Sequence, residues 1–524
     1  MASNGPGPMP SLLRPANPNQ HSAERSAETE QPSYGEQLWA QYEKYAKEPA
    51  PPPEKVQVAL RIGVFFDGTG NNASNSAMGQ ICGAQNPIEA RDIDGSCKPY
   101  MRDPESSYGN GVSNIKLLRE LYYAPQKTEG EGLKRCAYRA IYIEGIGTKA
   151  GEKDSLITSG TGRGDTGVSG CVQRAFREIE EHINDVQKEN PESEITSLTF
   201  DAFGFSRGAA AARHFANEVV RWLGPLELIL HDHSKAFSPR FNRQYGNDVD
   251  MGFIGLFDTV PSVAGLSNLG NVRSAIAPGI KLHLDRRYFR SVVQLVARDE
   301  YRANFALSRV KPDHLEIALP GAHSDIGGGY LDEVQECVLV SPMQALEVPI
   351  NTEVSQTSIY RNAVQTKKRW MAKGWPAQWL EIVTPEPLLL PQDSQDRLGL
   401  RKKRVYAGLQ LKRPMSNKLA GVYLRVMYEL AKQNGVQLEE IPETPEYAIP
   451  SELQALCDRF VTGDYSTTPE EETMLKLRYI HLSAHWNHPL GKRDGGSLKV
   501  VYINAPTVDA VRVQHPHVPD WTLW

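Results

Sequence analysis

The residues with the clearest chemistry lie in the segment FDAFGFSRGAAAARHF. Gly204-Phe205-Ser206-Arg207-Gly208 is a G-x-S-x-G sequence between an apolar run, TSLTFDAF, and an alanine-rich run, AAAARHFANEVV. A strand followed by a helix is the context that a nucleophile elbow needs, because its sharp turn tolerates only small residues beside the serine. We therefore predict that Ser206 is the nucleophile of a serine hydrolase. The alternative is a glycine-rich strand–helix turn with an incidental serine.

A serine nucleophile needs a base, and the base needs an acid to orient it. In α/β hydrolases the chain order is serine, then acid, then histidine. Asp258 ends the apolar run FIGLFDTV, where a strand terminus would direct its carboxylate into the site. A helix-capping or turn aspartate is the alternative interpretation. Asp201 is a weaker rival because it lies within the strand before the serine, and Asp250 precedes its strand, at the wrong end.

The base must be chosen from thirteen histidines. His323 stands in LPGAHSDIGGGY, directly after an apolar strand and within a glycine-rich loop that could bring its ring to the serine. A surface-loop histidine is the alternative there, and His481 and His485, in RYIHLSAHWN, are alternative bases. His231 and His233 resemble a metal-binding pair but lack a third ligand nearby, so we expect a solvated loop and no metal or cofactor.

The loop DGTGNN, which begins at Asp67, follows the first apolar run. Gly68 and Thr69 would let backbone N–H groups approach a substrate carbonyl, and Arg207, at the start of the next helix, would complete an oxyanion hole. Asp67 is expected to orient the loop without a catalytic role. A Walker phosphate-binding loop is excluded because no GK[ST] follows, and GTGRGDTG (160–167) fails for the same reason.

Strands and helices alternate through the middle of the chain. Apolar strands are predicted at 56–66, in RAIYIEGIGT, before Ser206, in FIGLFDTV and in HLEIAL, with helices near 113–123 and 167–187 between them. This alternation predicts an α/β fold of the α/β-hydrolase type, with a mostly parallel, doubly wound sheet. In such sheets the chemistry collects at the carboxyl ends of the strands, where the polar, glycine-rich turns fall.

Composition divides the chain into three parts. Residues 1–57 are rich in Pro, Ser, Ala and Glu and predict a flexible tail and linker with one short amphipathic helix over 36–48. Residues 58–330 are the predicted hydrolase core. Residues 331–524 are predicted to form a largely helical cap or carboxyl-terminal region packed on that core, with helices near 417–434 and 451–461.

The bulk composition excludes several classes of protein. A net charge of -5 over 524 residues gives no polyanion-binding signature, so we expect no nucleic-acid partner. No apolar run approaches the roughly 20 residues that span a bilayer. The start, MASNGPGPMPSLLRPANPNQ, lacks a secretory signal, so we expect a cytoplasmic protein. Six cysteines without a CxxC pair predict free thiols, although Cys82 and Cys97 could pair in an oxidising space.

Five motifs, found in order along residues 58–330, indicate a resemblance to a known family. FFDGTGNN, YIEGIGT, GFSRGAAAAR, GLFDTV and PGAHSDIGGGY resemble a bacterial family of α/β-hydrolase domains, with a weaker similarity in RYIHLSAHW. That family includes the first class of type VI secretion lipase effectors, which are antibacterial phospholipases. Carried over motif by motif, the resemblance implies a triad of Ser206, Asp258 and His323.

The resemblance also implies a substrate, partners and a place of action. The substrate would be membrane glycerophospholipids of a rival cell, cleaved by phospholipase A1 or A2 activity. The partners would be a VgrG-type protein of the secretion spike and a cognate periplasmic immunity protein. The effector would leave the producer's cytoplasm without a signal peptide and act in the periplasm, at the membranes of the target cell.

Two alternative functions stay open at this point. The elbow is equally compatible with an esterase or thioesterase acting on soluble esters. A non-catalytic spike adaptor could retain the fold, although an intact order of serine, aspartate and histidine argues against it. The segment KKRWMAKGWPAQWL (367–380) holds three of the eight tryptophans among four basic residues and would suit a lid or a membrane-docking element. Tryptophans packed in the core of their own region are the alternative.

Overall fold

The described part of the chain comprises residues 33–47, 55–155, 167–261, 279–391, 400–486 and 504–519 of a computed structural model. The chain divides between Glu54 and Lys55 into two units. The first contains α1 (Tyr34–Lys47), close to the helix predicted over 36–48. All remaining elements belong to the second unit. The segment GTGRGDTG (160–167), rejected above as a phosphate-binding loop, lies almost wholly outside the described residues.

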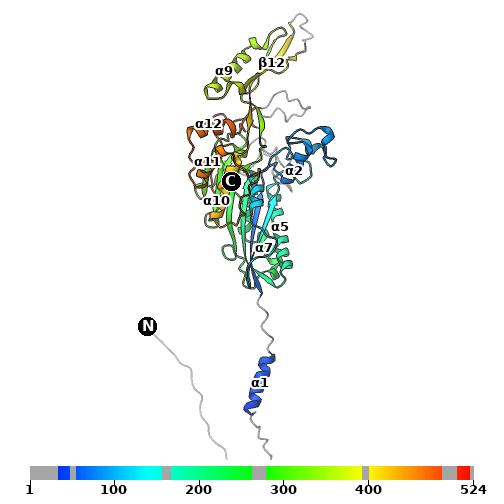
Figure 1. The fold of residues 1–524 in the computed structure, drawn as a ribbon, viewed down its shortest axis with the longest axis vertical. Coiled ribbons are helices and arrows are strands. Elements are labelled where there is room, and N and C mark those ends of the chain that lie inside the picture. Colours follow the sequence, from blue (N-terminus) through cyan, green and yellow to red (C-terminus); the bar gives the residue numbers. More distant parts are fainter. Residues whose placement is uncertain are drawn as a thin grey trace, which may run out of the picture. The chain divides into compact units, whose positions relative to one another are not determined.

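A six-stranded parallel sheet forms the centre of the second unit, with the order β2-β1-β3-β4-β5-β7 (Figure 1). Its strands are β1 (Val56–Phe66), β2 (Lys134–Ile143), β3 (Ser193–Phe205), β4 (Val249–Phe257), β5 (Val292–Ala297) and β7 (Leu315–Leu319). The prediction of an α/β fold with a mostly parallel sheet is confirmed, and β1 has the predicted bounds. β5 was not among the predicted strands.

The strand register brings the carboxyl ends of the central strands level. Phe66 of β1 pairs with Gly204 of β3, and Phe205 of β3 pairs with Phe257 of β4. Loops that follow these three strands therefore start at one edge of the sheet.

Helices cover both faces of the sheet, as Figure 1 shows with α5 and α7 on one side and α10, α11 and α12 on the other. One apolar core joins the sheet to α5 (Val168–Glu189), α6 (Arg207–Val220) and α7 (Pro225–Asp232). The second joins it to α3 (Asn114–Leu121), α10 (Leu419–Gln433), α11 (Ser451–Val461) and α12 (Pro469–Arg478). The alanines of α6, residues 209–212, are fully buried, because small side chains let this helix lie close to the sheet.

A second sheet, antiparallel and five-stranded, lies in the carboxyl-terminal region. Its long strand β12 (Lys402–Met415) pairs with β8 (Val334–Leu339), β9 (Gln344–Pro349), β10 (Leu380–Val383) and β11 (Leu388–Leu389), and α9 (Ser358–Ala372) packs on it. The prediction of a largely helical region missed this sheet. Basic residues at both ends of β12 obscure the period-two pattern in its sequence, and its partner strands are short.

The tryptophans of 367–380 pack into the core of this region. Trp375 is buried with Leu380, and Trp370 and Trp379 are half-buried against the same cluster. The guanidinium of Arg413 lies 5.0 Å from the ring centroid of Trp375. This arrangement corresponds to the core-packing alternative given above.

Cys82 and Cys97 form a disulfide bond, so the prediction of free thiols is wrong for this pair. Cys82 is the last residue of α2 (Ala73–Cys82), and Gly83 after it takes the left-handed conformation that turns the chain back. The cysteines at 136, 171, 337 and 457 form no disulfide bond within the described part of the chain.

Three further short elements lie in the described part of the chain: α8 (His323–Gly327), β6 (Leu307–Ser308) and β13 (Gln514–His515), the last two paired in parallel. No described helix has the length and apolar character that crossing a membrane requires.

Candidate functional site

Residues from four strand ends meet at the carboxyl edge of the parallel sheet. Ser206 follows β3, Asp258 follows β4, His323 follows the β7 strand after a short turn, and the loop that starts at Asp67 follows β1. All four belong to the residues singled out from the sequence. Their placement follows from the parallel order of the strands, which puts every strand-to-helix turn at the same edge.

Ser206 occupies a sharp turn between β3 and α6. Its φ of 59° and ψ of -122° lie outside the regions that residues with a side chain normally adopt. Its backbone N–H donates to the carbonyl of Phe257 over 3.0 Å, and Val260 N–H donates to its carbonyl over 3.2 Å. These two bonds fasten the turn to the end of β4.

The two glycines of the G-x-S-x-G sequence have steric causes. A Cβ on residue 204 would lie 2.4 Å from the carbonyl oxygen of Gly208. A Cβ on residue 208 would lie 2.3 Å from the carbonyl oxygens of Phe66 and Asp67. Any larger side chain at either position would push the turn away from α6 or from the end of β1.

Asp258 and His323 form a buried hydrogen-bonded pair. Oδ2 of Asp258 lies 2.5 Å from Nδ1 of His323, and Ala297 N–H donates to Oδ1 over 3.0 Å. Because an ionised carboxylate can only accept, Nδ1 carries the hydrogen and Nε2 keeps its lone pair. Asp258 itself has a φ of 47°, so a second residue of the site has a left-handed backbone.

The ring of His323 contacts two phenylalanines. Its centroid lies 4.6 Å from that of Phe205, the residue before Ser206, and 4.9 Å from that of Phe305. Ser206 and His323 line one cavity of about 240 Å³. Its other walls are Thr69, Asn71, Asn110, Phe205, Arg302, Phe305, Ser324, Gly329 and Tyr330.

Burial and charge set the ionisation of the pair. Burial alone would raise the pKa of Asp258, but Arg512 and His323 outweigh it and hold that pKa well below its ordinary value. Burial lowers the pKa of His323, and the Asp258 carboxylate offsets only part of that effect. The pair is therefore a carboxylate beside a neutral imidazole at neutral pH, and such an imidazole can accept a proton.

The rival acids have other surroundings. Asp201 is fully buried and is bound by Arg61 over 2.7 and 2.9 Å and by the Tyr122 hydroxyl over 2.8 Å. Asp250 is exposed near the amino-terminal end of β4. Neither of them lines the cavity of Ser206.

The alternative bases also lie away from the cavity. His481 binds Asp325 through its Nδ1 over 2.6 Å and stacks on Tyr330, with 3.9 Å between centroids. His485 contacts Asn504. His481 thus lies behind a cavity wall formed by Tyr330.

The histidine pair at the end of α7 does not converge on one point. His233 lies 2.8 Å from Glu180, and the exposed His231 contacts the neighbouring Asp232.

The loop after β1 is held by the buried carboxylate of Asp67, which accepts from Tyr142 over 2.6 Å and from Ser113 over 2.8 Å. It also accepts from Gly68 N–H over 2.7 Å, so this N–H, predicted to face the substrate, is already used. The Thr69 N–H has no acceptor among the described residues. The Arg207 side chain donates through Nε to the Thr69 hydroxyl and so ties the loop to the start of α6.

Two groups of functional interest had no signal in the sequence. Arg302 lines the cavity and forms a fork on Glu300, with Nε and Nη2 3.0 and 2.8 Å from the carboxylate oxygens. Glu300 in turn accepts from the backbone N–H of His323. Arg512, near the carboxyl terminus, binds both oxygens of Asp258. Isolated charges in irregular segments resemble solvated surface residues, so only the fold identifies them.

One group of residues has the composition of a metal site. Ligand atoms of His283, Asp313 and His517 lie within 4.8 Å of one another. However, Nε2 of His517 accepts from the Leu284 N–H over 3.0 Å, and its Nδ1 lies 2.8 Å from Asp313. Nδ1 therefore carries a hydrogen donated to that carboxylate and offers a metal no lone pair.

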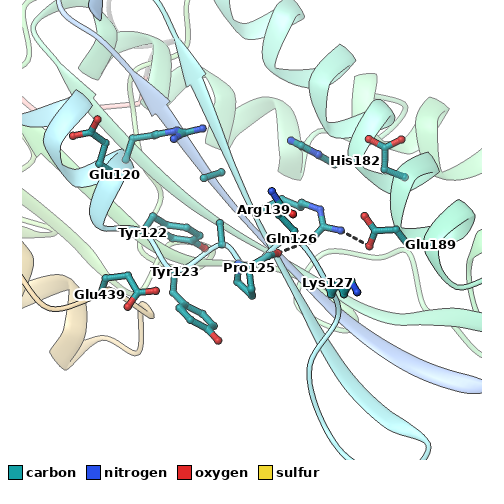
Figure 2. A pocket seen from close by; sticks show the side chains of 14 residues that line it. Glu120, Tyr122, Tyr123, Pro125, Gln126, Lys127, Arg139, His182, Glu189 and Glu439 are labelled. Atoms are coloured by element: carbon teal, nitrogen blue, oxygen red, sulfur yellow. Dashed lines mark hydrogen bonds and ion pairs between the residues drawn. The ribbon is translucent and has the colours of Figure 1, made fainter.

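A larger cavity, of about 790 Å³, lies beside the outer strand β2 and contains the ion pair Arg139–Glu189 (Figure 2). The described side chains that line it include no serine, threonine or cysteine. It offers no nucleophile comparable to Ser206.

Comparison with known proteins gives the chain a family. Residues 227–372, which contain Asp258 and His323, match the family model "T6SS, Phospholipase effector Tle1-like, catalytic domain". The chain is 30% identical to the protein in a solved structure of the Tle1 effector bound to the VgrG spike of the type 6 secretion system. That alignment covers 88% of this chain and 94% of the other, with a TM-score of 0.66.

Other comparisons add nothing to this assignment. A structure of an uncharacterized protein from Pseudomonas aeruginosa is 17% identical over 83% of this chain and 54% of its own, with a TM-score of 0.35. No curated protein matches the sequence. The match to the Tle1 effector spans 88% of this chain and 94% of the other, and the range matched by the family model includes Asp258 and His323. The chain therefore belongs to the Tle1 family of type VI secretion phospholipase effectors.

Proposed function

We propose that this effector is an α/β hydrolase that cleaves carboxylic esters of membrane glycerophospholipids, as a phospholipase A1 or A2, with Ser206 as nucleophile, His323 as base and Asp258 as the orienting acid. One observation carries the proposal. The strained Ser206 shares one cavity with His323, whose ring binds the buried Asp258 carboxylate, at the carboxyl edge of the sheet. Strain of this kind persists only where the surrounding structure holds it, and it is common at active sites.

The proposed reaction has two halves. Nε2 of His323 takes the proton of the Ser206 hydroxyl while the oxygen attacks the ester carbonyl, and the proton then goes to the leaving lysophospholipid oxygen. The fatty acyl group stays on Ser206. A water molecule, deprotonated by the same nitrogen, attacks the acyl-enzyme, and a fatty acid leaves with the serine restored. Asp258 stabilises the imidazolium that forms in each half.

The oxyanion of the tetrahedral intermediate needs two donors. We assign them to the backbone N–H groups of Thr69 and Arg207. The first has no other acceptor in the described structure and lies on a cavity wall. The second is at the amino terminus of α6, where the helix dipole favours negative charge. Gly68 is left out of this assignment because its N–H binds Asp67.

Membership of the family supports a proposal for delivery and target. The Tle1 effector that resembles this chain is bound to a VgrG spike. We propose that this chain is likewise carried by a VgrG-type protein and acts as an antibacterial toxin on target-cell membranes from the periplasm. We further propose that a periplasmic immunity protein protects the producer. Membranes of rival cells supply the glycerophospholipid esters that the proposed mechanism cleaves.

The test is fatty-acid release from vesicles of phosphatidylethanolamine and phosphatidylglycerol with different acyl chains at sn-1 and sn-2. The wild-type chain should release acyl chains, and their identity distinguishes A1 from A2 activity. Ser206→Ala should lower kcat by about three to six orders of magnitude. Ser197→Ala, on the same strand but far from the cavity, is the matched control.

Undiminished activity of Ser206→Ala would refute the mechanism. Activity confined to soluble esters would indicate an esterase. A folded wild-type chain that hydrolyses neither the phospholipid vesicles nor a soluble ester would indicate a spike adaptor.

A further inference from the structure

The carboxyl-terminal segment 504–519 forms part of the wall behind the proposed catalytic pair. Leu307 N–H donates to the Val513 carbonyl over 2.9 Å, and Arg309 N–H donates to the His515 carbonyl over 3.0 Å. These bonds belong to the parallel pairing of β6 with β13. They fix the segment against the stretch that contains Phe305, one wall of the cavity.

Arg512 reaches from this segment to Asp258. Its Nη1 lies 2.6 Å from Oδ1 and its Nη2 lies 2.8 Å from Oδ2. Its Nε donates to the carbonyl of Phe305 over 2.7 Å. Three hydrogen bonds therefore fix the planar guanidinium of Arg512, whose side chain is only 5% exposed. Two of these bonds also fix the plane of the Asp258 carboxylate.

The position of the carboxylate decides what His323 can do. Oδ2 accepts from both Arg512 and His323, and Oδ1 accepts from both Arg512 and the Ala297 N–H. Rotation of the carboxylate about its χ2 angle would break both arginine bonds together. The fork therefore keeps Oδ2 facing the imidazole.

We propose that Arg512 is a positioning residue of the hydrolase site, which holds the Asp258 carboxylate so that its Oδ2 receives the Nδ1 hydrogen of His323. The inference rests on the proposed function, because it needs Asp258 and His323 to be the acid and the base. It makes Arg512, a residue of the carboxyl-terminal segment, a component of the active site.

The charge of Arg512 has a second effect. The charged groups that face the Asp258–His323 pair are Arg512, Arg302 and Glu300. Arg302 and Glu300 bind each other, so their charges largely offset at His323. Arg512 balances the carboxylate, and without it the imidazolium form of His323 would be stabilised. Loss of Arg512 should therefore raise the pKa of His323.

The test measures kcat/KM against pH on dihexanoylphosphatidylcholine, a soluble phospholipid. Arg512→Gln should lower kcat at least tenfold and move the acid limb to higher pH by about one unit or more, because a positive charge is lost beside the pair. Arg512→Lys should lose kcat but keep the acid limb, since it retains the charge without the fork. Gln514→Ala, on the same segment and directed to Arg309, should match the wild type in both.

A double-mutant cycle separates positioning from general support of the fold. If Arg512 acts through Asp258, then Asp258→Asn/Arg512→Gln should have the kcat of Asp258→Asn within about threefold. The double variant removes both charges and so leaves no unpaired charge buried. Its kcat relative to Asp258→Asn therefore still tests whether Arg512 acts through Asp258 if Arg512→Gln alone does not fold.

Additive losses with an unmoved acid limb would overturn the inference while leaving the proposed function standing. Undiminished activity of Ser206→Ala in the same assay would instead mean that the proposed function had failed.

Discussion

Replacement of Asp258 by asparagine keeps the shape of the side chain and removes its charge. All its contacts in the structure come from donors: Ala297 N–H, two nitrogens of Arg512, and Nδ1 of His323. An amide group can satisfy only some of these donors, because its NH₂ is itself a donor. An NH₂ in the Oδ1 position would face two fixed donors, the Ala297 N–H and Nη1 of Arg512. We therefore expect it in the Oδ2 position, facing His323.

The rearrangement determines the size of the effect. An NH₂ beside Nδ1 forces the hydrogen of His323 onto Nε2, and that nitrogen can then no longer accept the serine proton. A wrong tautomer in a triad of this kind lowers kcat by about four orders of magnitude. Arg512 also loses its counter-charge in a buried place, which should cost about 3 to 5 kcal/mol of unfolding free energy.

The assay is fatty-acid release from soluble phospholipid together with thermal unfolding. Asp250→Asn, an exposed carboxylate on the same strand, should match the wild type in both measurements. An Asp258→Asn enzyme within tenfold of the wild-type kcat would refute the assignment of Asp258 as the acid. If Asp258→Asn kept the wild-type kcat but unfolded at a lower temperature, the Asp258–Arg512 pair would have a structural role only.

Three further predictions test the base, the compartment and the disulfide. His323→Ala should be as inactive as Ser206→Ala, and the double variant should lose little more, because triad members act as a unit; an active His323→Ala beside an inactive His481→Ala or His485→Ala would mean that the base is wrong. Expression with a secretory signal should kill cells, whereas the unmodified chain and a signal-bearing Ser206→Ala chain should be tolerated; equal killing from both compartments would contradict the compartment hypothesis. Cys82→Ser/Cys97→Ser should unfold at lower temperature, since a bond across 15 residues contributes about 3 kcal/mol in the chain-entropy account, and an unchanged melting temperature would show that the bond is dispensable.

Most of the candidate site could be predicted from the sequence, because its residues lie at strand ends, and glycines mark several of those ends. Ser206 stands between two glycines whose hydrogen atoms face backbone oxygens, and His323 begins the short helix α8, which ends at the first of three successive glycines. Such turns need glycine because a side chain would not fit, so the glycines in the sequence indicate where the turns lie. Asp258 was predicted from a different signal, its place at the end of an uninterrupted apolar strand.

The parts that the sequence did not indicate come from distant, irregular segments. Arg512 lies in DAVRVQ, where alternation would place the valines inside and the arginine outside. In the structure Val511 is 66% exposed and Arg512 is buried. Its partner is 254 positions away, and no local pattern encodes that distance. The antiparallel sheet was missed for a similar reason, because β12 gains its four partners from separate segments.

Two strained residues of the site are fastened to one another. Ser206 and Asp258 both have positive φ angles, and each such conformation costs of order 1–3 kcal/mol. The bonds from Ser206 N–H to Phe257 and from Val260 N–H to Ser206 join the two turns, and Asp258 N–H donates to Leu295 in the next strand. Neither turn can relax without breaking bonds at the edge of a sheet whose two faces are packed. The hydroxyl and the carboxylate are therefore held in place before a substrate binds, as the proposed mechanism requires of a preorganised site.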